Sequence, residues 1–154
     1  MAIKSIESPL AELTLRRYEK PYKLDKRGLV AKLCLSLGLL QPGDSRDVVV
    51  DVLYVLLDAK SKHENLTSIE VRMRVVDLRK QFGLKLIGIA DSNIRRQLLR
   101  LRDIFIVEKI KNTYRIIEHE KLYVLFQEKI ESFYLPSILS RVKEYIGAVD
   151  EQFY

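Results

Sequence analysis

The pattern of apolar residues changes abruptly from helical to extended after Asp103, and this junction limits the fold more than any other feature of the chain. Over residues 91–103 the apolar side chains recur at every third or fourth position, as on one face of a helix, at Ile94, Leu98 and Leu101. Residues 104–110 and 114–117 are instead rich in β-branched residues, and a polar turn at 111–113 separates them. The sequence therefore predicts a helix followed directly by a β-hairpin with a basic, polar tip.

Further helices are predicted on both sides of this unit. Thr67 and Glu70 form the capping-box pattern at the start of a helix that is expected to end at Gly83. A more apolar helix, capped at Asp44 or Ser45 and continuing to about Lys60, is expected at the centre of the core, with a buried strand at 48–50 as the competing prediction. The remaining helices are expected at residues 26–37, at about 120–135 and from Pro136 onward, after an arm or short helix over residues 1–25.

The composition is that of one globular domain with short extensions. The chain has 154 residues, of which 47% are hydrophobic and 31% are charged, with only six Gly and four Pro. The single cysteine, Cys34, excludes a disulfide scaffold and lies on an apolar helix face, so we expect an inert core thiol in a reducing, cytoplasmic setting. No apolar run has the length of a signal peptide or a membrane span, and we expect no membrane partner.

The positive charge is concentrated in one third of the chain. Residues 67–117 contain 12 basic and 5 acidic side chains, whereas residues 118–154 contain 4 basic and 7 acidic ones, and the net charge of the whole chain is +6. A basic face on a neutral or acidic body is typical of a protein that binds nucleic acid, although a solvated helix face would give the same count. We divide the chain into an N-terminal arm and helix (1–44), a basic domain (45–117) and a C-terminal helical extension (118–154).

The helix at 67–82, the helix at 91–103 and the hairpin that follows resemble the winged helix-turn-helix domain. The segment from Ser92 to Lys109, SNIRRQLLRLRDIFIVEK, is similar to the recognition helix of that family and to the strand that leads into its wing. Phe105 departs from the pattern, because many members have Gly there. The resemblance implies a mainly α fold with a small β-hairpin wing and additional N- and C-terminal helices. The chain as a whole also resembles uncharacterised archaeal winged-helix proteins.

The resemblance implies a DNA-binding protein, expected to be a transcriptional regulator, with a recognition helix at about 92–103 and a wing at about 106–117. A recognition helix places its N-terminal half against base edges in the major groove. Arginine forms paired bonds to guanine there, and short polar groups donate and accept. We expect base contacts from Ser92, Asn93, Arg96 and Gln97, phosphate contacts from Arg95 and Arg100, and phosphate or minor-groove contacts from Lys109, Lys111, Asn112 and Arg115.

Two competing interpretations of these cations remain open at the level of sequence. The arginines of 91–103 would form ordinary salt links if they paired with Asp91 and Asp103 on a solvated helix. Basic residues of the preceding helix would either touch the DNA backbone or simply solvate that helix; they are Arg72, Arg74, Arg79 and Lys80.

Catalysis finds no support in the sequence. The two histidines, His63 and His119, do not have the spacing of metal ligands, and no phosphate-binding loop or nucleophile motif is present. We therefore expect no catalytic residue, no metal site and no cofactor.

The expected partner is double-stranded DNA, bound by a homodimer that pairs through the C-terminal helices. The dimer prediction rests on apolar residues along one side of those helices, namely Phe126, Ile130, Phe133, Ile138 and Val142. The same residues would equally let the helices fold back and pack within one chain. The alternative function is a winged-helix module that binds protein rather than DNA, and structured RNA is a further candidate partner.

Overall fold

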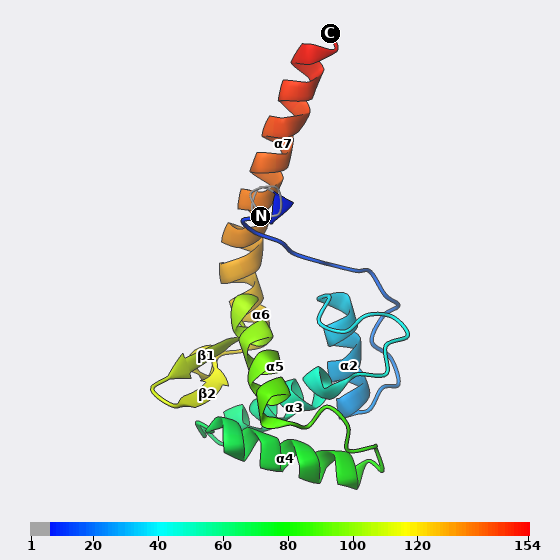
Figure 1. The fold of residues 1–154 in the computed structure, drawn as a ribbon, viewed down its shortest axis with the longest axis vertical. Coiled ribbons are helices and arrows are strands. Elements are labelled where there is room, and N and C mark those ends of the chain that lie inside the picture. Colours follow the sequence, from blue (N-terminus) through cyan, green and yellow to red (C-terminus); the bar gives the residue numbers. More distant parts are fainter. Residues whose placement is uncertain (1–6) are drawn as a thin grey trace.

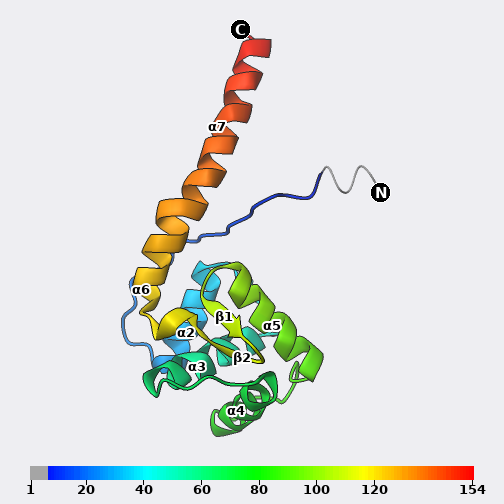
Figure 2. The same cartoon turned by 90° about the vertical axis from the view of Figure 1, so that its left-hand side faces the viewer.

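The computed structural model describes residues 7–154 and is mainly helical, with one two-stranded antiparallel sheet, as the sequence predicts. Its elements in chain order are α2 (Lys26–Ser36), α3 (Val48–Ser61), α4 (Ser68–Gln81), α5 (Asp91–Asp103), β1 (Val107–Ile110), β2 (Thr113–Ile116), η1 (Ile117–His119), α6 (Leu122–Leu125), η2 (Phe126–Tyr134) and α7 (Leu135–Gln152). Figure 1 shows a body built from α2 to β2, from which the C-terminal helix projects as a rod. Figure 2 shows the same rod from the side, with its end far from the body. Within residues 7–154, none of the helices combines the length and the apolar character that crossing a bilayer requires.

Helix α3 is the central element of the core. It packs against α2, α4, α5 and β2, and nine of its 14 residues are buried. The segment 48–50 is helical rather than a strand, and the helix begins at Val48, later than the sequence predicts. The later start of the helix has a local cause. The Asp44 carboxylate accepts a hydrogen bond from the backbone N–H of Arg46 at 2.9 Å, and this bond forms a turn instead of a helix cap.

Helices α4 and α5 follow their sequence signals closely. The Thr67 hydroxyl accepts a bond from the Glu70 N–H at 3.2 Å, and the Glu70 carboxylate accepts one from the Thr67 N–H at 3.0 Å, so the predicted capping box is confirmed. The predicted stripe on α5, formed by Ile94, Leu98 and Leu101, is fully buried against the core. The spacing of a few apolar residues thus determines which face of α5 is left outside.

The hairpin is confirmed, but its first strand is shorter than predicted. Pairing runs from Val107 with Ile116 to Ile110 with Thr113, and the turn is reduced to Lys111 and Asn112. Residues 104–106 are not in the strand because Phe105 takes a left-handed backbone conformation, with φ of 63°. Its ring stacks edge-to-face on Tyr134 with centroids 5.1 Å apart, a contact that offsets part of the strain. Leu66 forms an additional antiparallel bridge with Tyr114, which the sequence does not predict.

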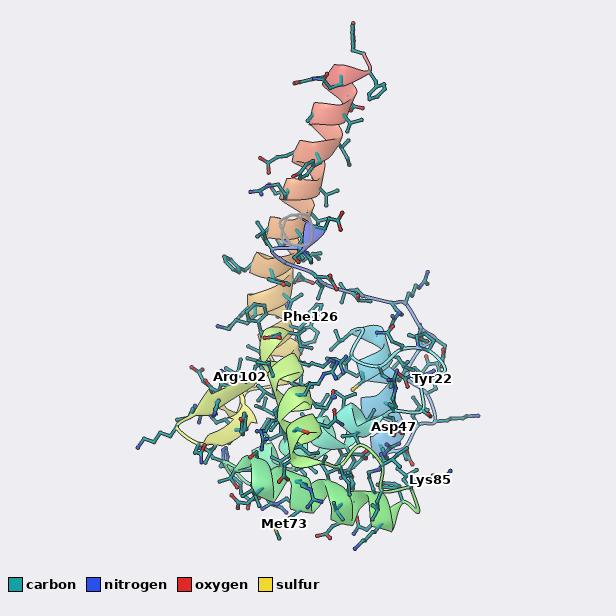
Figure 3. The ribbon with its side chains drawn as sticks, viewed as in Figure 1. Tyr22, Asp47, Met73, Lys85, Arg102 and Phe126 are labelled. Carbon is teal, nitrogen blue, oxygen red and sulfur yellow. The ribbon has the colours of Figure 1, made fainter. Side chains whose placement is uncertain are left out.

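A cluster of four charged residues, two of them buried and two partly buried, joins α2, α3 and α4. The Asp51 carboxylate is fully buried and accepts bonds from Arg79 Nη1 at 2.6 Å and from Arg27 Nε at 2.9 Å. Asp47 accepts from the same two arginines and lies between α2 and α4 (Figure 3). Burial alone would raise the pKa of Asp47, but the bonds from Arg27 and Arg79 outweigh it and hold that pKa below its ordinary value. The two arginines balance the two carboxylates, so the cluster is neutral overall.

The prediction of two separate C-terminal helices is wrong. Residues 122–152 form one continuous rod, in which α6 passes into the wider π-helical segment η2 and then into α7. Pro136 lies in the first turn of α7 rather than after a break. Proline lacks an N–H and crowds the carbonyl four residues before it in a regular α-helix. The wide turns of η2 precede Pro136 and accommodate the ring, so the chain continues without a kink.

An extended N-terminal arm lies along α2. The Arg16 backbone N–H donates to the Ser36 carbonyl at 2.8 Å, and its guanidinium donates to the carbonyls of Leu35 and Leu40. Nearer the N-terminus, the Glu12 backbone exchanges hydrogen bonds with the Tyr134 hydroxyl at the start of α7. The arm therefore connects the loop after α2 with the start of α7.

Candidate nucleic-acid interface

The outward face of α5, beside the hairpin, carries three exposed arginines. With the stripe of Ile94, Leu98 and Leu101 turned inward, the exposed positions of the helix are Asp91, Ser92, Arg95, Arg96, Leu99, Arg102 and Asp103. Within residues 7–154, the side chains of Arg95, Arg96 and Arg102 make no hydrogen bond or ion pair; Asp91 instead pairs with Arg72 of α4 at 3.4 Å. The salt links with Asp91 and Asp103 that would neutralise these arginines are absent from that part of the chain. We call Ser92, Arg95, Arg96, Leu99 and Arg102 the outer face of α5.

Three of the predicted site residues lie instead on the flank of α5, in a chain of hydrogen bonds. Asn93 Nδ2 donates to the Gly88 carbonyl at 2.6 Å, and Gln97 Nε2 donates to Asn93 Oδ1 at 3.0 Å. Arg100 donates to Gln97 Oε1 at 2.7 Å and to the Leu39 carbonyl at 2.6 Å. This polar ladder joins the loop before α5 to the loop after α2.

Arg100 is half-buried, unlike the arginines of the outer face. Burial lowers the pKa of its guanidinium, and the neighbouring positive charge of Arg96 lowers that pKa further. Its hydrogen-bond acceptors within the described chain are neutral oxygens rather than carboxylates. Arg100 therefore remains a cation without a bonded counterion.

A groove of about 560 Å³ lies beside the ladder. It runs between the flank of α5, the loop that connects α2 with α3, and the first residues of α3. Four of the predicted site residues are brought together there, namely Asn93, Arg96, Gln97 and Arg100. Arg46, which the sequence analysis missed, lines the opposite side; its guanidinium pairs with Asp44 at 3.1 Å and is 86% exposed.

The predicted site residues of the hairpin differ in how free their side chains are. Lys111 and Asn112 form the exposed turn, and Lys109 is exposed with its ammonium 5.6 Å from the centre of the Tyr114 ring. Arg115 is different, because its Nε pairs with the Glu108 carboxylate on the facing strand at 2.8 Å. The hairpin tip thus offers two lysines and an amide, and Arg115 is held by Glu108. The hairpin lies beside α5 in both views of the fold (Figures 1 and 2).

The arginines of α4 serve the fold. Arg79 is 3% exposed and belongs to the ionic cluster that joins α2, α3 and α4, so it does not reach a DNA backbone. Arg74 pairs with Glu64 at 2.9 Å, and Arg72 donates to the Ile89 carbonyl at 2.7 Å. The alternative that α4 contributes these cations to a DNA surface is not supported by their contacts.

Cys34 and the two histidines are not part of the outer face of α5, and they do not line the groove. Cys34 is fully buried, and burial raises the pKa of its thiol to about 12, so it stays protonated and unreactive at neutral pH. His63 and His119 stack with ring centroids 5.3 Å apart. No cluster of three or more His, Cys, Asp or Glu suited to a metal ion occurs in residues 7–154.

The main omission of the sequence analysis is Leu99. It lies in the middle of the outer face, between arginines, and is 51% exposed. Its signal was available, since position 99 is adjacent to the buried Leu98 and one turn from Arg95 and Arg96. Arg46 had no such signal, because its place opposite α5 depends on the path of the loop after α2.

Neither a protein-family model, nor a curated protein, nor a solved structure matches the chain.

Proposed function

We propose that the chain binds duplex DNA as a winged helix-turn-helix, with α5 as the recognition helix and the β1–β2 hairpin as the wing, and that it acts as a transcriptional regulator. The order of α3, α4, α5 and the hairpin agrees with the order of elements in such a domain. The observation that carries the proposal is the outer face of α5, whose three arginines are exposed and unpaired among the described residues.

The chemistry of this face suits the major groove. Arg95, Arg96 and Arg102 are free to approach phosphates or the O6 and N7 atoms of guanine. Leu99 between them provides the kind of apolar contact that recognises the 5-methyl group of thymine. The lysines of the hairpin tip extend the positive surface to the neighbouring backbone.

A titration of duplex DNA at two salt concentrations tests this proposal. Affinity should fall as salt rises, because each phosphate contact contributes about 0.9 to the slope of log K against log salt. We expect the double variant Arg95→Gln, Arg102→Gln to lower that slope by up to about 2 and to weaken binding roughly 10-fold or more.

The matched control is Arg141→Gln, which removes a cation from the exposed surface of α7, where Arg141 pairs with Glu144 at 2.8 Å. It should leave duplex binding unchanged. Equal and feeble binding by the wild type and the double variant would contradict the proposal. A competition with duplex RNA belongs in the same experiment, since the deep, narrow major groove of RNA does not admit a helix.

Dimerisation through α7 is the second part of the proposal. The apolar residues of the rod follow the alternating spacing of four and three that is typical of a coiled coil, at Leu135, Leu139, Val142, Ile146, Val149 and Phe153. All residues from 139 to 154 are exposed, so the fold-back of this part onto the body does not occur in the single chain. Phe126 and Ile130, which the sequence assigned to the same stripe, contact the body instead, and Ile130 is buried.

A second copy of the chain is the partner that suits this stripe. Helices in proteins are stabilised mainly by packing of an apolar face, and no residue of α7 is buried in the single chain. A stripe with heptad spacing is complementary to itself, as a two-fold dimer requires. Sedimentation equilibrium at tens of micromolar should therefore show a dimer. Val142→Asp should produce a monomer, whereas Ser140→Asp, on the polar side of α7, should not; a monomeric wild type would overturn this part.

A protein-binding module remains the second candidate, and one observation favours it. Ile69 and Met73 are adjacent on the outer face of α4, 65% and 58% exposed, and Met73 points away from the body (Figure 3). Methionine is enriched at protein–protein interfaces relative to the rest of a protein's surface. If the chain binds a protein rather than DNA, the double variant Arg95→Gln, Arg102→Gln would have no effect on binding of that protein. Met73→Lys would weaken the binding.

A further inference from the structure

The groove beside α5 has more positive than negative charge. Three arginines and a single carboxylate line it, and the carboxylate, Asp44, is bonded to Arg46. Arg100 is half-buried and bonded to neutral oxygens, and Arg96 has no partner within residues 7–154. Arg100 is a partly buried cation beside the exposed Arg96, and a partly buried charge without a counterion is costly unless an anion approaches it. The groove therefore has the electrostatics of an anion site.

The shape of the groove indicates a ligand larger than a simple ion. Its exposed apolar lining is mainly Ile87, which is 48% exposed, because Leu39, Val48 and Val49 are buried; the amides of Asn93 and Gln97 lie at the side. Its volume of about 560 Å³ lies within the usual range for small-molecule sites, roughly 300–1,000 Å³. Sites of that kind combine an apolar surface with a few polar groups that fix the orientation of the ligand.

We propose that this groove binds a small phosphorylated metabolite that carries a ring, such as a nucleoside monophosphate. The phosphate lies between Arg96 and Arg100, and the ring packs against the exposed side chain of Ile87. Arginine suits this role because its planar fork binds two phosphate oxygens at once.

Ligand binding would also regulate DNA binding, because Arg96 belongs both to the groove and to the outer face of α5. A phosphate held by Arg96 removes one cation from the DNA surface, and the two ligands compete. This coupling rests on the proposed function, whereas binding of the metabolite does not.

Calorimetric titration of the full chain with AMP in low salt, in the absence of DNA, tests the site itself. We expect saturable binding of AMP at concentrations up to roughly 5 mM, with a dissociation constant below about 1 mM. Adenosine lacks the phosphate and should bind at least about 10-fold more weakly. Inorganic phosphate should also bind more weakly than AMP. Phosphate binding as tight as that of AMP would overturn the ring contact, and no binding of AMP would overturn the site.

Two variants and a control assign the binding to the groove. Arg96→Gln and Arg100→Gln should each weaken AMP binding about 10-fold or more, since each removes a charge-assisted bond. Arg95→Gln makes the same change in charge on the same helix but outside the groove, and it should have no effect. Arg96 has no contact that folding requires, so its variant stays informative even if Arg100→Gln is unstable. AMP binding that is equally weak in Arg95→Gln would show general charge attraction and overturn the proposal.

A duplex competition separates this inference from the proposed function. If the groove binds the metabolite, AMP should displace duplex DNA from the wild-type protein. The same concentration of AMP should not displace duplex DNA from the Arg96→Gln variant. AMP binding without any duplex binding would leave the site intact and refute the DNA proposal. Duplex binding that weakens in Arg100→Gln, together with no AMP binding, would assign the groove to a backbone phosphate and refute the metabolite site.

Discussion

Replacement of Asp51 by asparagine should destabilise the protein more than any other single removal of a charge that we consider. The Asp51 carboxylate is fully buried and accepts bonds from Arg79 at 2.6 Å and from Arg27 at 2.9 and 3.2 Å. The Asp51→Asn change keeps the shape of the side chain but removes its negative charge. Arg79, which is 3% exposed, would then retain one carboxylate bond, to Asp47 at 3.0 Å, and one to the Lys85 carbonyl at 2.8 Å.

The magnitude follows from that remaining environment. Removal of one partner of a buried ion pair costs roughly 3–5 kcal/mol, because the other charge stays buried and uncompensated. Asp47 still faces both arginines, so we expect the lower end, about 3 kcal/mol. A domain of this size is stable by roughly 5–15 kcal/mol. The variant should therefore lose a large share of its stability, and its melting temperature should fall by about 6–12 °C.

Urea denaturation followed by far-UV circular dichroism measures this loss. The midpoint should shift while the slope stays constant, since the surface exposed on unfolding does not change. Asp58→Asn is the matched control: Asp58 pairs with Lys62 at 3.5 Å on the surface of α3, and its loss should cost under about 1 kcal/mol. A change of less than about 1 kcal/mol for Asp51→Asn, or one equal to that of Asp58→Asn, would refute the reasoning.

Three further predictions concern Cys34, His119 and Lys111. Because burial raises the pKa of Cys34 to about 12, a thiol reagent at pH 8 should modify the native chain slowly and the urea-unfolded chain at once; fast native labelling would contradict the burial. Burial of the ring, followed by the nearby charges of Arg115 and His63, lowers the pKa of His119, so the unfolded chain takes up this proton first and stability should fall as the pH drops below about 6.5. His119→Gln should remove that part of the pH dependence, and an unchanged profile would exclude His119 as its source. Lys111→Gly should stabilise the hairpin turn by up to about 1 kcal/mol in urea denaturation, because residue 111 has φ of 55°; a loss would mean that the lysine side chain contributes packing.

Local signals account for the parts of the fold that the sequence predicts. The capping box at Thr67 and Glu70, the stripe of α5 and the β-branched hairpin each depend on residues that are close in sequence. The bridge between Leu66 and Tyr114 escaped prediction because it joins segments far apart in the chain. The continuity of the rod escaped it because proline normally ends a helix, and the preceding π-helical turns carry no recognisable sequence pattern.

The sequence predicts which residues belong to the candidate site better than it predicts how their side chains are arranged. The residues of α5 and the hairpin were named from sequence, and Arg95 and Arg96 are exposed as a DNA surface needs. Gln97 and Arg100 each precede a buried residue of the stripe, which places them at its edge. Whether an edge position faces solvent or a neighbour depends on the loop after α2, whose Leu39 carbonyl holds Arg100. Sequence spacing gives the angle around a helix but not the neighbour at that angle.

The π-helical segment η2 sets the rotational phase between the two ends of the rod. Leu125 just before it and Ile130 within it face the body, whereas the stripe that begins at Leu135 continues along α7 into solvent. Deleting one residue from the end of η2 would turn that stripe by about 100° relative to the body and shift it by about 1.5 Å, without altering either surface. The relative orientation of two bodies joined through α7 would then be an adjustable angle, encoded by the number of residues in η2.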